Sequence, residues 1–71
     1  MSDVEKIKLL EEMLDLEDAD FARETELSDI EEWDSMAAIS LIALMDEKFG
    51  KRITGNEIRA FKTIGDVIDS M

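Results

Sequence analysis

The sequence Glu31-Glu32-Trp33-Asp34-Ser35-Met36 marks the point where an acidic connecting segment ends and an uncharged segment begins. Residues 35–45 carry no charged side chain, although 19 of the 71 residues of the chain are acidic. Asp and Ser at such a boundary predict the start of a helix, because their side-chain oxygens accept hydrogen bonds from the free N–H groups of the first turn. A hydroxyl at a helix start is also exposed, and a phosphate attached to it meets unpaired amides and the positive end of the helix dipole. Ser35 is therefore both a candidate helix cap and a candidate site of phosphate attachment.

Apolar residues recur at helical spacing on both sides of this boundary. Ser2 and Glu5 form a capping-box pattern and predict a first helix over about residues 3–16. The second helix is predicted over residues 35–49 and ends at Gly50. Its spacing predicts a buried stripe of Ala38, Leu41, Ile42, Met45 and Phe49. A different face is expected to carry Ala37, Ser40, Ala43 and Glu47.

Two further capping patterns follow in the last third of the chain. Thr54 with Glu57 predicts a short third helix, and Thr63 with Asp66 predicts a last one over about residues 64–71. No stretch alternates apolar and polar residues for long enough to predict a strand. The expected fold class is all-α, a small four-helix bundle of three main helices and one short one. Its first two helices are joined by a long loop, and residues 1–71 form a single domain.

The composition restricts the possible functions. A chain of 71 residues buries only about 60% of its unfolded surface, so its core is small. It has no Cys or His, which removes the thiolate nucleophile and the commonest general base and metal ligand. Its formal charge of −11 disfavours nucleic acid and anionic membrane. The net charge is −13 over residues 1–47 and +2 over residues 48–71. With no membrane-length apolar run and no signal-peptide pattern at the N-terminus, we expect a soluble, cytoplasmic monomer.

The acidic segment between the first two predicted helices invites comparison with a calcium-binding loop. With either Asp15 or Asp18 as first ligand, the sixth position lacks the required Gly, so no metal site is predicted. Apolar residues within the segment indicate instead that the loop docks on the core; they are Phe21, Leu27, Ile30 and Trp33.

Three features fall in the order and spacing of the acyl carrier protein family: Trp33-Asp34-Ser35-Met36, the helix end at Phe49-Gly50, and Thr63-Ile64-Gly65-Asp66-Val67-Ile68. The chain resembles that family over nearly its whole length. The resemblance implies a non-catalytic carrier with a 4′-phosphopantetheine arm, derived from coenzyme A, on Ser35. It also implies that Asp34 helps to dock the phosphopantetheinyl transferase and its metal. The other implied partners are acyl-loading and acyl-transfer enzymes, such as a ligase, a ketosynthase or an acyltransferase.

The chain departs from the carriers of primary fatty acid synthesis, which usually have Gly two residues before the motif Asp and an acidic second helix. Here Glu32 and the uncharged run 35–45 occupy those places. The resemblance therefore favours a specialised pathway, such as polyketide, modified-lipid or aminoacyl transfer. An apolar strip with charges at its ends is expected to bind partner enzymes; its residues are Asp34, Met36, Ala37, Ser40, Ala43, Asp46 and Glu47.

Two other functions compete with the carrier. In the first, the chain is an unmodified acidic helical adaptor and Ser35 is only a cap, since capping serines are common. In the second, it is a small-molecule enzyme, which is disfavoured because solvated carboxylates lack the desolvated pairing that tunes them for acid–base work. Treatment with a transferase distinguishes the carrier from the adaptor.

Overall fold

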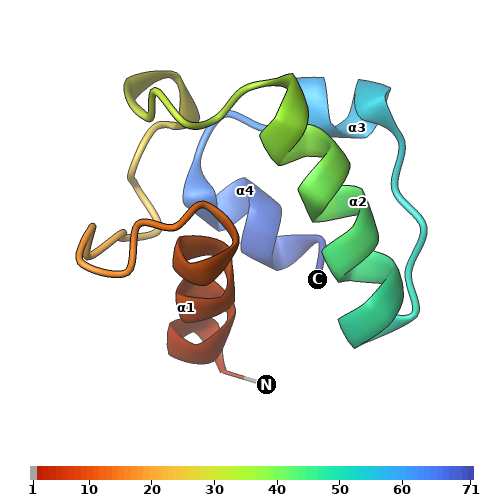
Figure 1. Cartoon of the computed structure of the whole chain (residues 1–71), viewed down its shortest axis with the longest axis horizontal. Coiled ribbons are helices and arrows are strands. Elements are labelled where there is room, and N and C mark those ends of the chain that lie inside the picture. The colour runs from red at the N-terminus through yellow and green to blue at the C-terminus, as the bar shows by residue number, and fades with distance from the viewer. Residues whose placement is uncertain (1) are drawn as a thin grey trace.

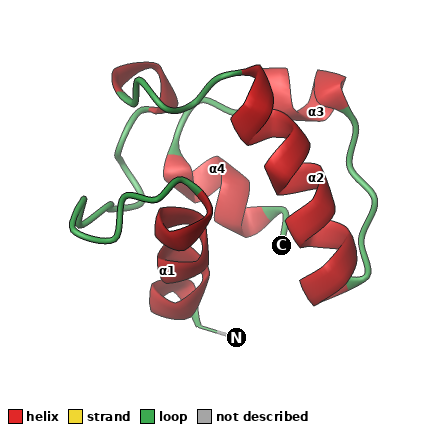
Figure 2. Ribbon diagram, in the orientation of Figure 1, coloured by secondary structure: helices red, strands yellow, loops and turns green. Residues whose placement is uncertain are grey.

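The computed structural model describes residues 2–71 and contains four α-helices and one 3₁₀ turn within that range. In chain order these are α1 (Asp3–Met13), η1 (Leu27–Asp29), α2 (Ser35–Phe49), α3 (Gly55–Ala60) and α4 (Ile64–Asp69). Helix α1 packs against both α2 and α4, and α3 lies near the start of α2 (Figure 1). The all-α class, the four helices and the long loop between α1 and α2 are confirmed (Figure 2). However, α4 has six residues, as few as α3, so only two of the helices are long.

Local signals set most of the helix boundaries. The Ser2 hydroxyl accepts the Glu5 N–H at 3.3 Å, and the Glu5 side chain bonds back to Ser2, which completes the predicted capping box. Gly50 ends α2 in the left-handed region at φ 60°, where a residue without Cβ is favoured. Thr54 and Thr63 cap α3 and α4 as expected. The predicted capping residues and the predicted end of α2 at Gly50 are therefore confirmed.

Helix α1 is shorter than expected and ends at Met13 instead of residue 16. Asp15 adopts a left-handed conformation at φ 58°, and the Leu16 N–H turns back to donate to the Glu11 carbonyl at 2.8 Å. This is the hydrogen-bond pattern of a Schellman turn, which satisfies the last carbonyls of the helix. Leu14 remains buried beyond the helix end, so the apolar periodicity extends further than the helix itself.

The core lies between α1, α2 and α4, with contributions from the loop. Its fully buried side chains are Leu10, Leu41, Met45, Ile64, Val67 and Ile68. Leu27 and Ile30 of the loop are also buried, and Phe21 and Trp33 pack against the same cluster. The prediction that the loop docks on the core is confirmed.

Hydrogen bonds hold the loop in place at three points. The Glu11 carboxylate is buried and accepts the Phe21 N–H at 2.8 Å. Arg23 bonds to Asp69 of α4 at 2.8 Å and to Asp3 of α1 at 3.0 Å. Both ion pairs are about half exposed, so each adds little stability, although the neighbouring Asp69 raises the pKa of Arg23.

The third attachment joins residues 23–27 to residues 62–65 through the backbone. The Leu27 N–H donates to the Lys62 carbonyl, and the Ile64 N–H donates to the Thr25 carbonyl, both at 2.9 Å. The Gly65 N–H likewise reaches the Arg23 carbonyl at 2.9 Å. The loop thus lies against the start of α4.

The capping box of α4 gives an expected dependence of stability on pH. The Asp66 carboxylate accepts the Lys62 N–H at 2.8 Å and the Thr63 N–H at 3.2 Å, and these bonds lower its pKa. A carboxylate with a lowered folded-state pKa stabilises the fold above its unfolded pKa of about 4, and this contribution disappears as the pH falls through the folded-state pKa. In urea unfolding at a series of pH values, Asp66→Asn should lose less stability on acidification than the parent. Equal losses in the two proteins would contradict the assigned role of Asp66.

Candidate functional site at the start of α2

Asp34, and not Ser35, caps the N-terminus of α2. The Asp34 Oδ1 atom accepts the Ala37 N–H at 3.0 Å, and its backbone carbonyl accepts the Ala38 N–H at 3.0 Å. Ser35 is the first helical residue and is exposed. Since Asp34 supplies the cap, the Ser35 hydroxyl is left accessible for other chemistry.

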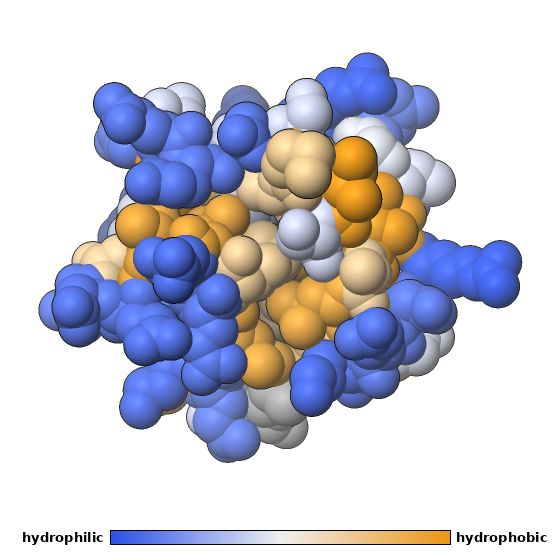
Figure 3. Space-filling view, in the orientation of Figure 1, coloured by the Kyte–Doolittle hydropathy of each residue, from blue (hydrophilic) through white to orange (hydrophobic). Residues whose placement is uncertain are grey.

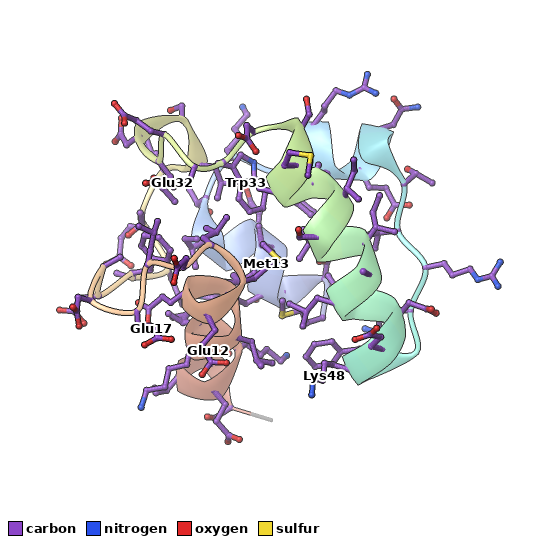
Figure 4. All side chains as sticks on the ribbon, in the orientation of Figure 1. Glu12, Met13, Glu17, Glu32, Trp33 and Lys48 are labelled. Atoms are coloured by element: carbon purple, nitrogen blue, oxygen red, sulfur yellow. The ribbon has the colours of Figure 1, made fainter. Side chains whose placement is uncertain are left out.

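The segment that leads into α2 is held firmly on the core side. The Ile30 side chain is buried, and the Trp33 N–H donates to the Ile30 carbonyl at 3.1 Å. Trp33 is half-buried where the chain enters α2 (Figure 4). The exposed hydroxyl of Ser35 therefore lies two residues after an anchored aromatic residue, which restricts the position of the helix start.

The expected buried stripe of α2 is confirmed at Leu41 and Met45, but the expectations for Ala37 and Ile42 are wrong. Ala37, expected on the exposed strip, is 4% exposed and lies in line with Leu41 and Met45 against the core. Ala38 is half-buried, and Ile42, expected in the buried stripe, is 37% exposed. The cause is the position of the shared core, which covers the side of α2 that carries residues 37, 41 and 45.

The remaining residues of the predicted strip are exposed on α2 or at its start. They are Asp34, Met36, Ser40, Ala43, Asp46 and Glu47. Sequence reasoning missed Ile39, which is 61% exposed and adds to the apolar character of this surface. Ile39 lies outside the buried stripe expected from the sequence, and this position in the pattern indicates an exposed side chain. Figure 3 shows apolar surface beside the upper half of α2.

Comparison with known proteins decides the family. The phosphopantetheine attachment site family matches residues 7–71. The chain belongs to the acyl carrier protein family. A curated relative, the acyl carrier protein of Acidothermus cellulolyticus, is 29% identical over 62 residues, which cover 87% of this chain and 74% of the relative. No solved structure matches the chain at a significant level.

Membership of the acyl carrier protein family defines the biochemical role in outline. Its members are non-catalytic carriers with a covalently attached 4′-phosphopantetheine arm, and they interact with phosphopantetheinyl transferases and acyl-processing enzymes. The start of α2 fits such an arm, because it offers an exposed hydroxyl on an anchored helix end. The Ser35 and Met36 N–H groups precede the first capping bond, which goes to Ala37, and they are therefore available to an anion at this end.

Two further findings concern metal binding and membrane crossing. Within residues 2–71, no three acidic, His or Cys side chains are grouped so as to hold a metal ion. In the same range, none of the helices combines the length and the apolar character needed to cross a membrane.

Proposed function

We propose that this carrier holds its phosphopantetheine arm on Ser35. The observation that supports this assignment is that Asp34 caps α2 and Ser35 stands exposed at the first helical position. A hydroxyl used as the cap has one of its two lone pairs engaged by an N–H, whereas the cap bond of α2 is made by Asp34 and leaves the Ser35 hydroxyl out of it. The proposal therefore assigns the cap and the nucleophile to two adjacent residues.

In the attachment step, the Ser35 Oγ atom attacks the β-phosphorus of coenzyme A. One P–O bond forms, the bond of the diphosphate breaks, and 3′,5′-ADP leaves, while the hydroxyl proton passes to a base of the transferase. In this step Oδ1 of Asp34 stays hydrogen-bonded to the Ala37 N–H, and the other carboxylate oxygen contacts the transferase and its metal. Once attached, the arm supplies a terminal thiol that holds an acyl or aminoacyl group as a thioester.

The attachment is tested by mass spectrometry. The protein is incubated with coenzyme A, Mg²⁺ and a broad-specificity phosphopantetheinyl transferase, and intact mass is then measured. We expect the mass of one arm to be added, and fragmentation should locate it on the peptide that contains Ser35. No added mass, or an arm on another serine, would disprove the assignment.

The pathway that we propose is a specialised one, outside primary fatty acid synthesis. Support comes from Trp33 immediately before the Asp-Ser pair and from the absence of charge in residues 35–45. We also propose a cytoplasmic location, because coenzyme A and its transferases act in that compartment. A monomeric state is part of the same proposal.

We further propose that partner enzymes bind the apolar strip formed by Met36, Ile39, Ser40 and Ala43. These side chains are exposed, and Asp34, Asp46 and Glu47 place charge only at the two ends. An interface with an uncharged centre and a polar rim owes its affinity mainly to shape and apolar contact. Ala37 is excluded from this surface because it is buried.

This surface gives a prediction for transferase kinetics. Ala43→Arg and Met36→Ala should each raise the KM for the carrier by about fivefold or more, which corresponds to about 1 kcal/mol at an interface position. Ala19→Arg adds the same charge in the exposed loop and serves as the matched control, which should retain the parental KM. Moderate salt should change the parental KM little. Parental KM values in both strip variants, or a large salt effect, would contradict the proposal.

A further inference from the structure

A hollow of about 420 Å³ lies between the middle of α2 and the segment 51–53, which belongs to the connection from α2 to α3. This connection runs back beside α2 toward its start (Figure 1). The apolar lining of the hollow includes Ile39, Ile42 and Ile53, and its charged lining consists of Asp46, Lys51 and Arg52. The hollow therefore adjoins the apolar strip of α2 and shares Ile39 with it.

The three isoleucines of the hollow differ in exposure. Ile53 is 8% exposed and belongs to the core cluster, so it forms a fixed floor. Ile42 is 37% exposed and Ile39 is 61% exposed, so aliphatic surface remains open to water at the side. Covering such surface is favourable, because apolar groups gain free energy on leaving water. The hollow can therefore receive an aliphatic side chain from another molecule.

Arg52 supplies a cation that forms no ion pair in the described part of the chain. Both ion pairs found there are made by Arg23. The neighbouring Lys51 donates to the Ser70 carbonyl at 3.3 Å, and the Asp46 carboxylate is not paired with either cation of the hollow. An exposed guanidinium can bind a carboxylate through two parallel hydrogen bonds. Arg52 is thus the point at which the hollow favours a carboxylate.

The charge of the hollow is opposite in sign to that of the rest of the chain. One acidic and two basic side chains give it a net charge of +1, against −11 for the whole protein. A basic surface is attracted to the acidic part of the chain, over residues 1–47, and gains nothing from the hollow. An acidic side chain has the reverse preference. The charges therefore favour one orientation of a partner on α2.

We propose that a partner enzyme places one aliphatic side chain in the hollow and an adjacent carboxylate against Arg52. The inference rests on the proposal that partners bind along α2, and it names the chemistry of the partner at one end of that surface. The aliphatic contact supplies the affinity, and the carboxylate selects the partner and its orientation, since a single exposed ion pair adds little free energy. The composition of the chain alone favours the opposite, a partner with a basic surface.

A larger groove, of about 580 Å³, opens beside Ser35. It is lined by Ser35 and by residues of the loop and of α3, so it belongs to the attachment site already described. The groove and the hollow have no lining residue in common. Arg59, which is exposed and lines the groove, therefore provides a matched control for Arg52.

The test uses the full chain, labelled with ¹⁵N, and two synthetic helical peptides as probes. Both peptides present one Leu in a background of Ala and Gln, and one helical turn later the first carries Glu and the second carries Lys. Amide chemical shifts report binding. We expect the Glu peptide to shift the amides of residues 39–43 and 51–53 in a saturable manner. The Lys peptide should bind about fivefold more weakly or worse.

Variants separate the contribution of the cation from that of the apolar surface. Arg52→Glu should weaken binding of the Glu peptide by about fivefold or more and strengthen binding of the Lys peptide. Arg59→Glu makes the same change of charge outside the hollow and should leave the order of the two peptides unchanged. Ile39→Ser should weaken both peptides alike, and the exposure of Ile39 means that this variant should keep the fold.

The outcomes distinguish this inference from the proposals on which it builds. Equal binding of the two peptides, or equal responses in the Arg52 and Arg59 variants, overturns the role of Arg52. Absence of saturable shifts around the hollow overturns the inference as a whole. Met36 lies outside the hollow, so a raised transferase KM in Met36→Ala without any peptide binding leaves the strip in place and overturns only the hollow.

Discussion

Ser35→Ala is expected to abolish attachment of the arm while the protein stays folded. The variant lacks the hydroxyl that forms the phosphoester, so no added mass should be detected after treatment with transferase. The cap of α2 is retained, because Oδ1 of Asp34 still accepts the Ala37 N–H. Alanine is also a strong helix former. We therefore expect the free energy of unfolding to change by less than about 1 kcal/mol, the typical effect of a lost cap.

Two measurements check this expectation. Intact mass gives the extent of attachment, and urea unfolding followed by circular dichroism gives the stability. Ser40→Ala is the matched control for loss of a hydroxyl, since Ser40 is exposed on the same helix and this variant should still gain the mass of one arm on Ser35. A collapsed helical signal in Ser35→Ala would assign Ser35 a structural role that the geometry does not give it.

Leu41→Ala is expected to have the largest effect on stability. Leu41 is fully buried in the middle of α2. Removal of such a side chain costs about 2–5 kcal/mol, which combines the lost transfer free energy with the cavity left behind. A chain of this size has a small total stability, of the order of 5 kcal/mol, so the variant should be largely unfolded under mild conditions.

The neighbouring Ile42 provides the control for Leu41→Ala. Ile42 is 37% exposed, so Ile42→Ala removes a similar volume from a site that is already partly hydrated. We expect a much smaller shift of the urea midpoint than for Leu41→Ala. Similar shifts in the two variants would mean that α2 is not oriented as described. The extent of attachment at Ser35 should fall in Leu41→Ala as the folded fraction falls. In Ile42→Ala it should stay near the value of the parent protein.

Features that depend on residues close in sequence could be predicted. The caps at Ser2 and Thr63 and the end of α2 at Gly50 rest on hydrogen bonds or backbone conformations within a few residues. The same holds for the start of α2, although the pattern could not tell whether Asp34 or Ser35 accepts the first bond. Only the geometry assigns that bond to Asp34.

Features that depend on distant contacts could not be predicted. Ala37 and Ala38 are adjacent and chemically identical, and only the tertiary packing of the core decides that Ala37 is buried and Ala38 only half-buried. Glu11 belongs by its charge to a solvated face, yet it is buried because it accepts the Phe21 N–H across the loop. The groove beside Ser35 combines residues from the loop, α2 and α3, so no local pattern reveals it.

The backbone pairing of residues 23–27 with residues 62–65 has a consequence for the order of folding. The loop is held by backbone bonds to Lys62, Ile64 and Gly65, which lie 35 to 42 residues further along the chain than their partners. Contacts this far apart in sequence form late, because a long segment must close before they form. During folding, the bonds from the loop to α1, such as the Phe21 N–H to the Glu11 carboxylate, close short segments and are expected to form before the pairing with residues 62–65. The loop that leads to Ser35 is therefore fully attached only after α4 has joined the core.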